Sequence, residues 1–164
     1  MEKEKIICFT GHRPQNLPWR NYECGEQFNN FRENLRNIII KNINEGYRIF
    51  ISGMAMGFDM ISADVVLELK EIYDIKLIAV LPYKNHSKSW NIKDKTKHSR
   101  ILKEADSVII LNEEYNRYCF FDRNKYMVDN SSKVIACYNF IKGGTLDTIK
   151  YAIKQGREVE YVGF

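Results

Sequence analysis

The sequence predicts an α/β fold in which a mostly parallel sheet of five to six strands carries helices on both faces. Apolar runs typical of strands alternate with helix-like segments along the whole chain. The strand-like runs are continuously apolar and do not alternate with polar residues, which indicates strands that are buried on both faces. Linkers, repeats and low-complexity segments are absent from the sequence, so we expect residues 1–164 to form one domain.

Each expected strand is a short apolar run that ends at a polar or turn-forming residue, such as Pro82 after the third run. The expected strands are residues 6–10, 48–52, 76–81, 107–111, 133–138 and, as a candidate sixth, 159–162.

The expected helices follow these strands in turn. They are residues 26–45, 59–72, 93–105, 123–130 and 145–155. In the first helix, apolar side chains recur at intervals of three or four residues, as in Phe28, Phe31 and Leu35, and Gly46 marks its end. The second helix is apolar over much of its surface, which is typical of a helix packed on a sheet.

Three glycine-bearing turns follow strands, at residues 10–14, 52–59 and 142–145. Right-handed crossovers place every strand-to-helix loop at the carboxyl edge of a parallel sheet, so these turns should meet there. Backbone N–H groups and helix N-termini at this edge attract anions. The turns therefore predict a phosphate cradle and a nucleotide-type ligand. Their candidate binding residues are Gly11, His12, Arg13, Ser52, Gly53, Met54, Gly57, Asp59, Gly143, Gly144 and Thr145.

These residues also have simpler interpretations. Gly53 can make a tight turn and Gly57 can let a helix approach its strand closely. Asp59 and Thr145 are suited to capping helices, although the same positions can bind ribose hydroxyls or phosphate oxygens. His12 is more typical of a hydrogen-bonding or capping group than of a catalytic base.

A fourth group of candidates, Arg123, Asn124 and Asp129, begins the short helix after an aromatic loop. Arg123 can clamp a phosphate, while Asn124 and Asp129 can bind ribose or base edges. The alternative is a surface ion pair. Tyr83 and Trp90 are candidates for stacking on a base or, equally, for packing into the core.

Composition narrows the functional classes. The net charge is +4, and residues 84–103 hold seven basic side chains against one acidic side chain, Asp94. Such a stretch is typical of a solvated helix face, with nucleic-acid binding as the alternative. The charged start and short apolar runs predict a cytoplasmic protein without a signal peptide or membrane span, and the scattered cysteines predict reduced thiols. We expect no metal site, because His86 and His98 are isolated in sequence. P-loop, GxGxxG and GxSxG motifs are also absent from the sequence.

The same blocks carry a resemblance to a known family. They are TGHRP (10–14), SGMAMGFDMISADVVLELK (52–70), LPYKNHSKSW (81–90), ILKEADSVIIL (101–111), RNKYMVDNSS (123–132) and GGTLDTIKYA (143–152). In this order they resemble the YpsA-like proteins of the SLOG superfamily, which joins the DprA/Smf and LOG proteins. The resemblance implies a Rossmann-like three-layer fold, a pocket at the carboxyl edge that uses the residues named above, and a nucleotide or nucleotide derivative as ligand.

The chain departs from the LOG enzymes, which release the base from a nucleoside monophosphate and carry a PGGxGTxxE motif. Here Lys142 replaces the proline, one loop residue is missing, and Thr148 stands in place of the catalytic glutamate. We therefore assign no catalytic residue and expect a non-catalytic nucleotide sensor. The alternatives are a nucleotide N-glycosidase that uses Asp59 or Asp129, and single-stranded DNA binding like that of DprA. The resemblance also suggests a homo-oligomer, with loop 115–121 as a candidate contact.

Overall fold

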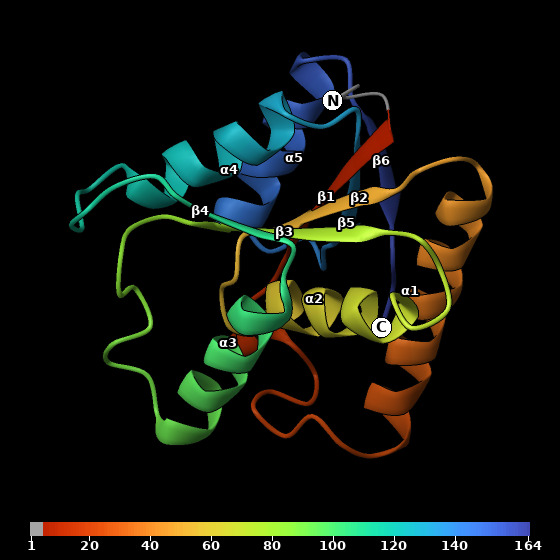
Figure 1. Ribbon diagram of the computed structural model, residues 1–164, viewed down its shortest axis with the longest axis horizontal. Coiled ribbons are helices and arrows are strands. Elements are labelled where there is room, and N and C mark those ends of the chain that lie inside the picture. Colours follow the sequence, from red (N-terminus) through yellow and green to blue (C-terminus); the bar gives the residue numbers. More distant parts are fainter. Residues whose placement is uncertain (1–4) are drawn as a thin grey trace.

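The structure is a computed structural model that describes residues 5–164. It confirms the predicted α/β fold: six parallel strands form one sheet in the order β4-β3-β2-β1-β5-β6 (Figure 1). The strands are β1 (Ile6–Gly11), β2 (Ile49–Ser52), β3 (Lys76–Leu81), β4 (Ser107–Ile110), β5 (Lys133–Cys137) and β6 (Glu158–Tyr161).

Five α-helices connect the strands, and a short 3-10 helix, η2 (Pro14–Asn16), follows β1. The α-helices are α1 (Glu26–Asn44), α2 (Phe58–Leu69), α3 (Ile92–Glu104), α4 (Cys119–Asp129) and α5 (Gly144–Lys154). Helix α4 begins four residues before the predicted start at Arg123. Its N-cap residue, Tyr118, makes no side-chain capping bond, so the sequence carries no capping signal there.

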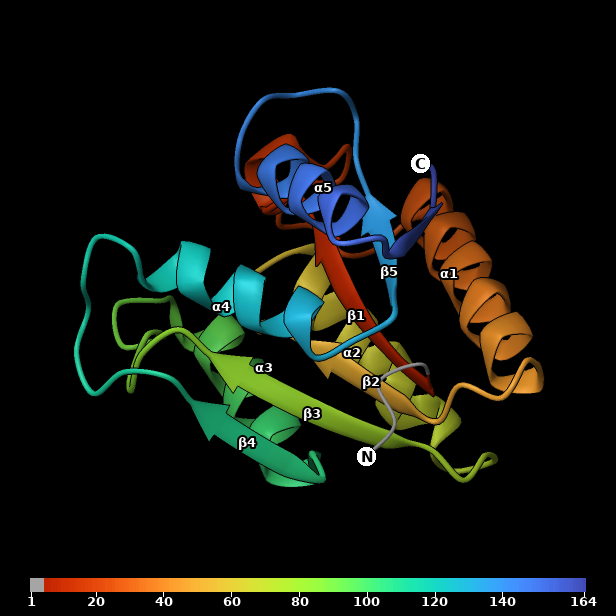
Figure 2. The ribbon, with the colours of Figure 1, turned by 90° about the horizontal axis from the view of Figure 1, so that it is seen from above.

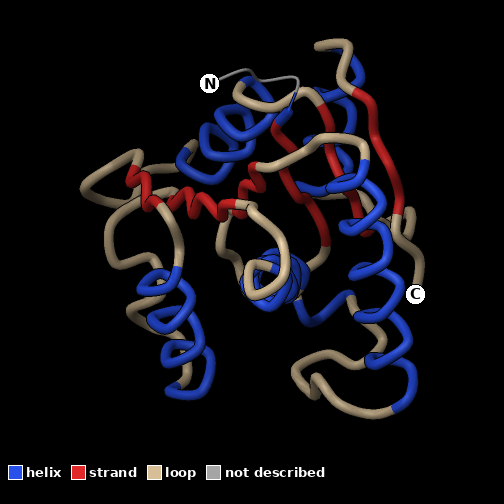
Figure 3. Tube along the Cα trace, turned by 45° about the vertical axis from the view of Figure 1, so that its right-hand side comes forward, coloured by secondary structure: helices blue, strands red, loops and turns tan. Residues whose placement is uncertain are grey.

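The helices cover both faces of the sheet. Helices α1, α2 and α3 lie on one side, and α4 and α5 on the other, as the ribbon views and the blue helices around the red strands show (Figures 1–3). Successive residues of β1 point into the two separate cores: Ile7 and Phe9 pack toward α1 and α2, while Ile6 and Cys8 pack with the side chains of α4 and α5. This burial on both faces explains the continuous apolar runs of the strands.

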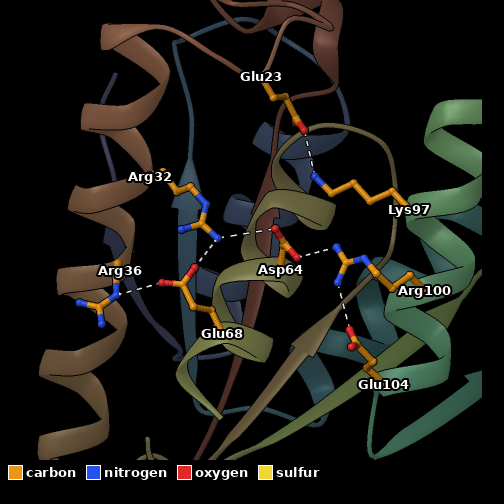
Figure 4. A network of polar contacts seen from close by, with 8 residues as sticks. All are labelled: Glu23, Arg32, Arg36, Asp64, Glu68, Lys97, Arg100 and Glu104. Atoms are coloured by element: carbon orange, nitrogen blue, oxygen red, sulfur yellow. Dashed lines mark hydrogen bonds and ion pairs between the residues drawn. The ribbon is translucent and has the colours of Figure 1, made fainter. Parts of the chain in front are cut away.

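Ion pairs connect the three helices on the first face (Figure 4). Arg32 of α1 lies 2.8 Å from Glu68 of α2, and Arg100 of α3 lies 2.7 Å from Asp64 of α2. Lys97 of α3 also pairs with a carboxylate, that of Glu23 before α1, at 2.9 Å. Two cations of the basic stretch at 84–103 are therefore bound to acidic side chains, and this part of the surface is less positive than the sequence predicts.

His86 and His98 are not isolated, which corrects the sequence-based expectation. The Nε2 atoms of the two rings lie 2.8 Å apart and both side chains are buried. The ring of Trp90 packs against both histidines, so this aromatic residue belongs to a small core between α3 and the loop before it. Burial lowers the pKa of His86 to about 3 and that of His98 to about 4. The pair is therefore neutral at pH 7, with one ring donating and the other accepting.

Candidate functional site

A cavity of about 250 Å³ opens at the carboxyl edge of the sheet. Its walls come from the loops after β1 and β5, from the start of α2 and from the first half of α4. From β1 the chain continues to β2 on one side, whereas β5 lies on the other side, so the crossovers change direction between β1 and β5. Such a switch point is where open parallel sheets bind their ligands.

Nine of the predicted binding residues line this cavity. They are Gly11, His12, Arg13, Asp59, Arg123, Asn124, Gly143, Gly144 and Thr145. The remaining five, Ser52, Gly53, Met54, Gly57 and Asp129, are not among its lining residues.

The glycines of the first two turns allow close packing. A Cβ atom on Gly11 would lie 2.3 Å from the Phe58 ring, and one on Gly57 would lie 2.5 Å from the His12 carbonyl oxygen. The Phe58 amide also donates to that carbonyl oxygen at 3.1 Å. The first turn therefore rests directly on the start of α2, which favours the packing interpretation of Gly57.

The second turn positions a carboxylate. The Ala55 amide donates to Asp59 Oδ2 at 3.2 Å, and the Ser52 hydroxyl donates to the Asp59 carbonyl oxygen at 2.9 Å. Met54 between them has a φ of 60° and a fully buried side chain, so the turn stores backbone strain that its surroundings must hold in place. Burial raises the pKa of Asp59, and the nearby Arg123 opposes this shift.

Arg123 joins this turn to α4. Its Nη1 donates to the Gly53 carbonyl oxygen at 2.9 Å, its Nε donates to Asn124 Oδ1 at 3.1 Å, and only 4% of the residue is exposed. The guanidinium groups of Arg123 and Arg13 lie 5.6 and 5.1 Å from the centre of the Phe120 ring. One aromatic ring thus holds two cations at the edge of the cavity.

The third turn is the open one. Gly143 has a φ of 148°, and a Cβ atom on Gly143 or Gly144 would meet no atom within 4 Å. Helix α5 begins here without a side-chain cap, so its first N–H groups have no intrahelical acceptor, and its first two residues line the cavity. Thr148, at the position of the LOG glutamate, donates its hydroxyl to the Gly144 carbonyl oxygen at 2.8 Å. Its side chain is therefore part of the helix and does not act as an acid or base.

His12 accepts a hydrogen bond at Nε2 from the Asn139 amide, at 3.0 Å. Burial lowers its pKa. The ring is therefore neutral near pH 7 and carries its proton on Nδ1, which fits the hydrogen-bonding interpretation and leaves Nε2 unavailable as a base.

Asp129 lies at the far end of α4 from the cavity. Its carboxylate accepts a hydrogen bond from the Tyr151 hydroxyl at 2.6 Å and pairs with Lys125 at 3.4 Å. Tyr83 does not line the cavity either, but its ring packs edge-on against Phe120, with the centroids 6.3 Å apart.

Sequence reasoning missed several lining residues. Gln15 and Asn16 come directly after the first turn, so adjacency to the motif was their only signal, and Lys142 begins the third turn without having been proposed to bind the ligand. Phe120 lies in the aromatic segment that we treated as a candidate contact between subunits. Its place beneath two arginines depends on the early start of α4.

With this geometry in view, comparison with known proteins identifies the family. The YpsA family model, described as "YspA SLOG family", matches residues 7–162. The chain belongs to this family.

Curated relatives of this YpsA family member are uncharacterised. The Bacillus subtilis prophage-derived protein YoqJ is 32% identical over 118 residues, which cover 64% of this chain and 69% of YoqJ. A UPF0398 protein of Macrococcus caseolyticus is 27% identical over 144 residues, covering 82% of this chain and 74% of the relative.

Two solved structures share the fold. DNA processing protein A (DprA) of Streptococcus pneumoniae superposes with a TM-score of 0.65 at 20% identity, covering 97% of this chain and 50% of DprA. The Helicobacter pylori DprA, described for its single-stranded DNA binding mode, gives a TM-score of 0.65 at 15% identity and covers 97% of this chain and 65% of that one. The present chain thus spans half to two thirds of these proteins, and the likeness concerns the fold.

Across residues 5–164, none of the helices combines the length and apolar character needed to cross a bilayer. The same residues contain no cluster of three or more His, Cys, Asp or Glu side chains that could hold a metal ion.

Proposed function

We propose that this protein binds a nucleotide or nucleotide derivative in the cavity at the carboxyl edge and acts as a non-catalytic sensor or regulatory protein. The observation that carries the proposal is the open N-terminus of α5, where Gly143 and Gly144 leave the backbone N–H groups accessible. Arg13, Arg123 and Lys142 line the same cavity, against the single carboxylate of Asp59. Helix dipole and side chains together favour an anion of the size of a phosphate.

Two buried groups support this proposal. Asp59 and Arg123 are only 5% and 4% exposed, and both line the cavity. Within residues 5–164, Asp59 Oδ1 and Arg123 Nη2 make no protein hydrogen bond, and they are not among the enclosed polar atoms that lack a partner, so both atoms remain open to a ligand. A ligand that accepts from Arg123 and donates a hydroxyl to Asp59, as the phosphate and ribose of a nucleotide do, would satisfy both.

The non-catalytic role is supported by the state of the other polar groups. Hydrolysis of an N-glycosidic bond needs a carboxylate that stabilises the developing cation or activates water. Thr148 cannot do this, His12 uses its Nε2 in a structural bond, and Asp129 does not line the cavity.

A nucleotide N-glycosidase is the second candidate, and one observation favours it. Asp59 is a cavity carboxylate whose pKa is raised by burial, as is typical of catalytic acids. Release of free base from a nucleotide, abolished in Asp59→Asn, would establish this activity and replace the sensor proposal.

Single-stranded DNA binding rests on the DprA fold and on the basic stretch. The ion pairs of Lys97 and Arg100 weaken that argument. An oligonucleotide whose binding falls steeply with salt would restore it.

The direct test is thermal-shift and calorimetric titration with AMP, NAD, ADP-ribose and cyclic dinucleotides. A ligand at a hundred times its Kd stabilises the fold by about 2.7 kcal/mol, which raises Tm by several degrees in a domain of this size. Arg13→Ala should weaken binding at least tenfold. The matched control is Arg117→Ala, since Arg117 is an exposed arginine that stacks on Tyr118 and does not line the cavity. Lack of any shift at millimolar ligand would refute the proposal.

A further inference from the structure

A second cavity, of about 130 Å³, lies between α4 and α5. These two helices pack side by side on the same face of the sheet (Figure 2). The cavity is lined by Phe120, Phe121, Asn124, Lys125, Gly144, Asp147, Thr148 and Tyr151. Phe120, Asn124 and Gly144 also line the first cavity, so the two share a wall.

The second cavity has a different character from the first. Three aromatic rings, Phe120, Phe121 and Tyr151, form its walls. The Tyr151 hydroxyl is fixed by Asp129 at 2.6 Å, which holds that ring in place. Aromatic walls around a small volume suit a flat heterocycle, because base and side chain can stack face to face.

Polar groups from both helices also line this aromatic space. Asn124 of α4 accepts from Arg123 through Oδ1, so its NH₂ group remains as a donor. Asp147 of α5 contributes an exposed carboxylate to the lining. A donor and an acceptor among the lining residues can bind the edge of a base, and the three aromatic rings favour a purine because it has the larger stacking face.

We infer that the cavity between α4 and α5 binds the purine base of a nucleotide whose phosphate lies at the N-terminus of α5. This inference rests on the proposed function. The two cavities meet at Gly144 and Asn124, so a single ribose can span them. The ligand class is therefore a purine nucleoside monophosphate, or the purine half of a larger nucleotide. Asp129, which does not line the first cavity, is a positioning residue that orients the Tyr151 ring.

The experiment compares ligands that share the phosphate but differ in the base. Calorimetric affinities are measured for inorganic phosphate, ribose 5-phosphate, UMP, AMP and GMP. We expect AMP or GMP to bind at least about tenfold more tightly than ribose 5-phosphate and UMP, since stacking and edge recognition add to the phosphate contact.

A matched pair of variants places the base. Phe121 and Tyr118 are both 56% exposed and lie close in sequence, with two residues between them, but only Phe121 lines the cavity. Phe121→Ala should abolish the purine preference and leave the affinity for ribose 5-phosphate unchanged, whereas Tyr118→Ala should change neither. Asp147→Asn, on the exposed surface of α5, should reduce the preference for purine nucleotides without altering the fold. This variant is a second, independent test of where the base binds.

The possible failures are distinguishable. If ribose 5-phosphate binds and purines bind no better, the base site is wrong and the proposed function stands. If purines bind tightly but Phe121→Ala and Asp147→Asn leave the preference intact, the base lies elsewhere. If none of the five compounds binds, the base site is wrong, and the proposed function falls with it only when NAD, ADP-ribose and cyclic dinucleotides also give no thermal shift.

Discussion

The buried histidine pair makes the stability of this protein depend on pH in a calculable way. His86 and His98 stay neutral in the folded state down to about pH 4, because their pKa values are lowered to about 3 and about 4. In the unfolded chain they take up protons near pH 6.5. The unfolded state therefore binds more protons below pH 6.5, and stability is lost as the pH falls through this window.

The size of the effect follows from linkage. At pH 5 each unfolded histidine lies about 1.5 pH units below its normal pKa, which corresponds to about 2 kcal/mol per residue. The pair should lower the free energy of unfolding by about 4 kcal/mol between pH 7 and pH 5. Protonating both rings would also place two donors 2.8 Å apart, so the pair cannot remain closed.

Urea denaturation at pH 7, 6 and 5 measures this change. His98→Gln keeps an amide that can bond to His86 but removes one titrating group, so the loss between pH 7 and pH 5 should fall by about half. Carboxylates that titrate in the same range contribute equally to both proteins and cancel in the comparison. An equally steep loss in His98→Gln would refute the account.

Three further predictions concern stability and reactivity. Gly57→Ala should destabilise the fold by more than about 2 kcal/mol, because Gly57 has a φ of 90° and its Cβ would lie 2.5 Å from the His12 carbonyl oxygen; thermal unfolding measures the drop in Tm. Lys133→Ala should cost about 2 kcal/mol in chemical denaturation, since the buried ammonium group donates to the buried Asn42 Oδ1 at 2.7 Å and its loss leaves that oxygen without a donor. Cys24 is exposed and should react rapidly with a thiol reagent, whereas the three buried cysteines should react only when the protein unfolds, as mass mapping can show.

The sequence predicted the sheet and helices well because strands buried on both faces give continuous apolar runs. The β1 run around Phe9 is such a case, with neighbouring side chains entering different cores. The start of α4 was missed because its N-cap residue, Tyr118, is not of a capping type and the aromatic side chains around it are typical of a loop. A local sequence pattern does not reveal the start of a helix when tertiary packing determines where the helix starts.

The site was predictable only in part for a similar reason. The motifs located the turns, but they did not show why each turn has a glycine. That reason depends on the neighbouring atoms, which are an aromatic ring at Gly11, a carbonyl oxygen at Gly57 and open space at Gly144. The contact between His86 and His98 joins a loop to a helix without any periodic relation in sequence. Contacts of this kind arise from the fold and leave no trace in spacing.

The hydrogen bond from Arg123 to the Gly53 carbonyl oxygen spans 70 residues of sequence. It fastens a turn from the first third of the chain to a helix from the last third, so the floor of the cavity exists only when both parts have assembled. Occupancy of the cavity would consequently slow global opening rather than the breathing of one loop. Amide hydrogen exchange should then show equal protection gained in β1 and β5, which pair in the sheet although they lie far apart in sequence.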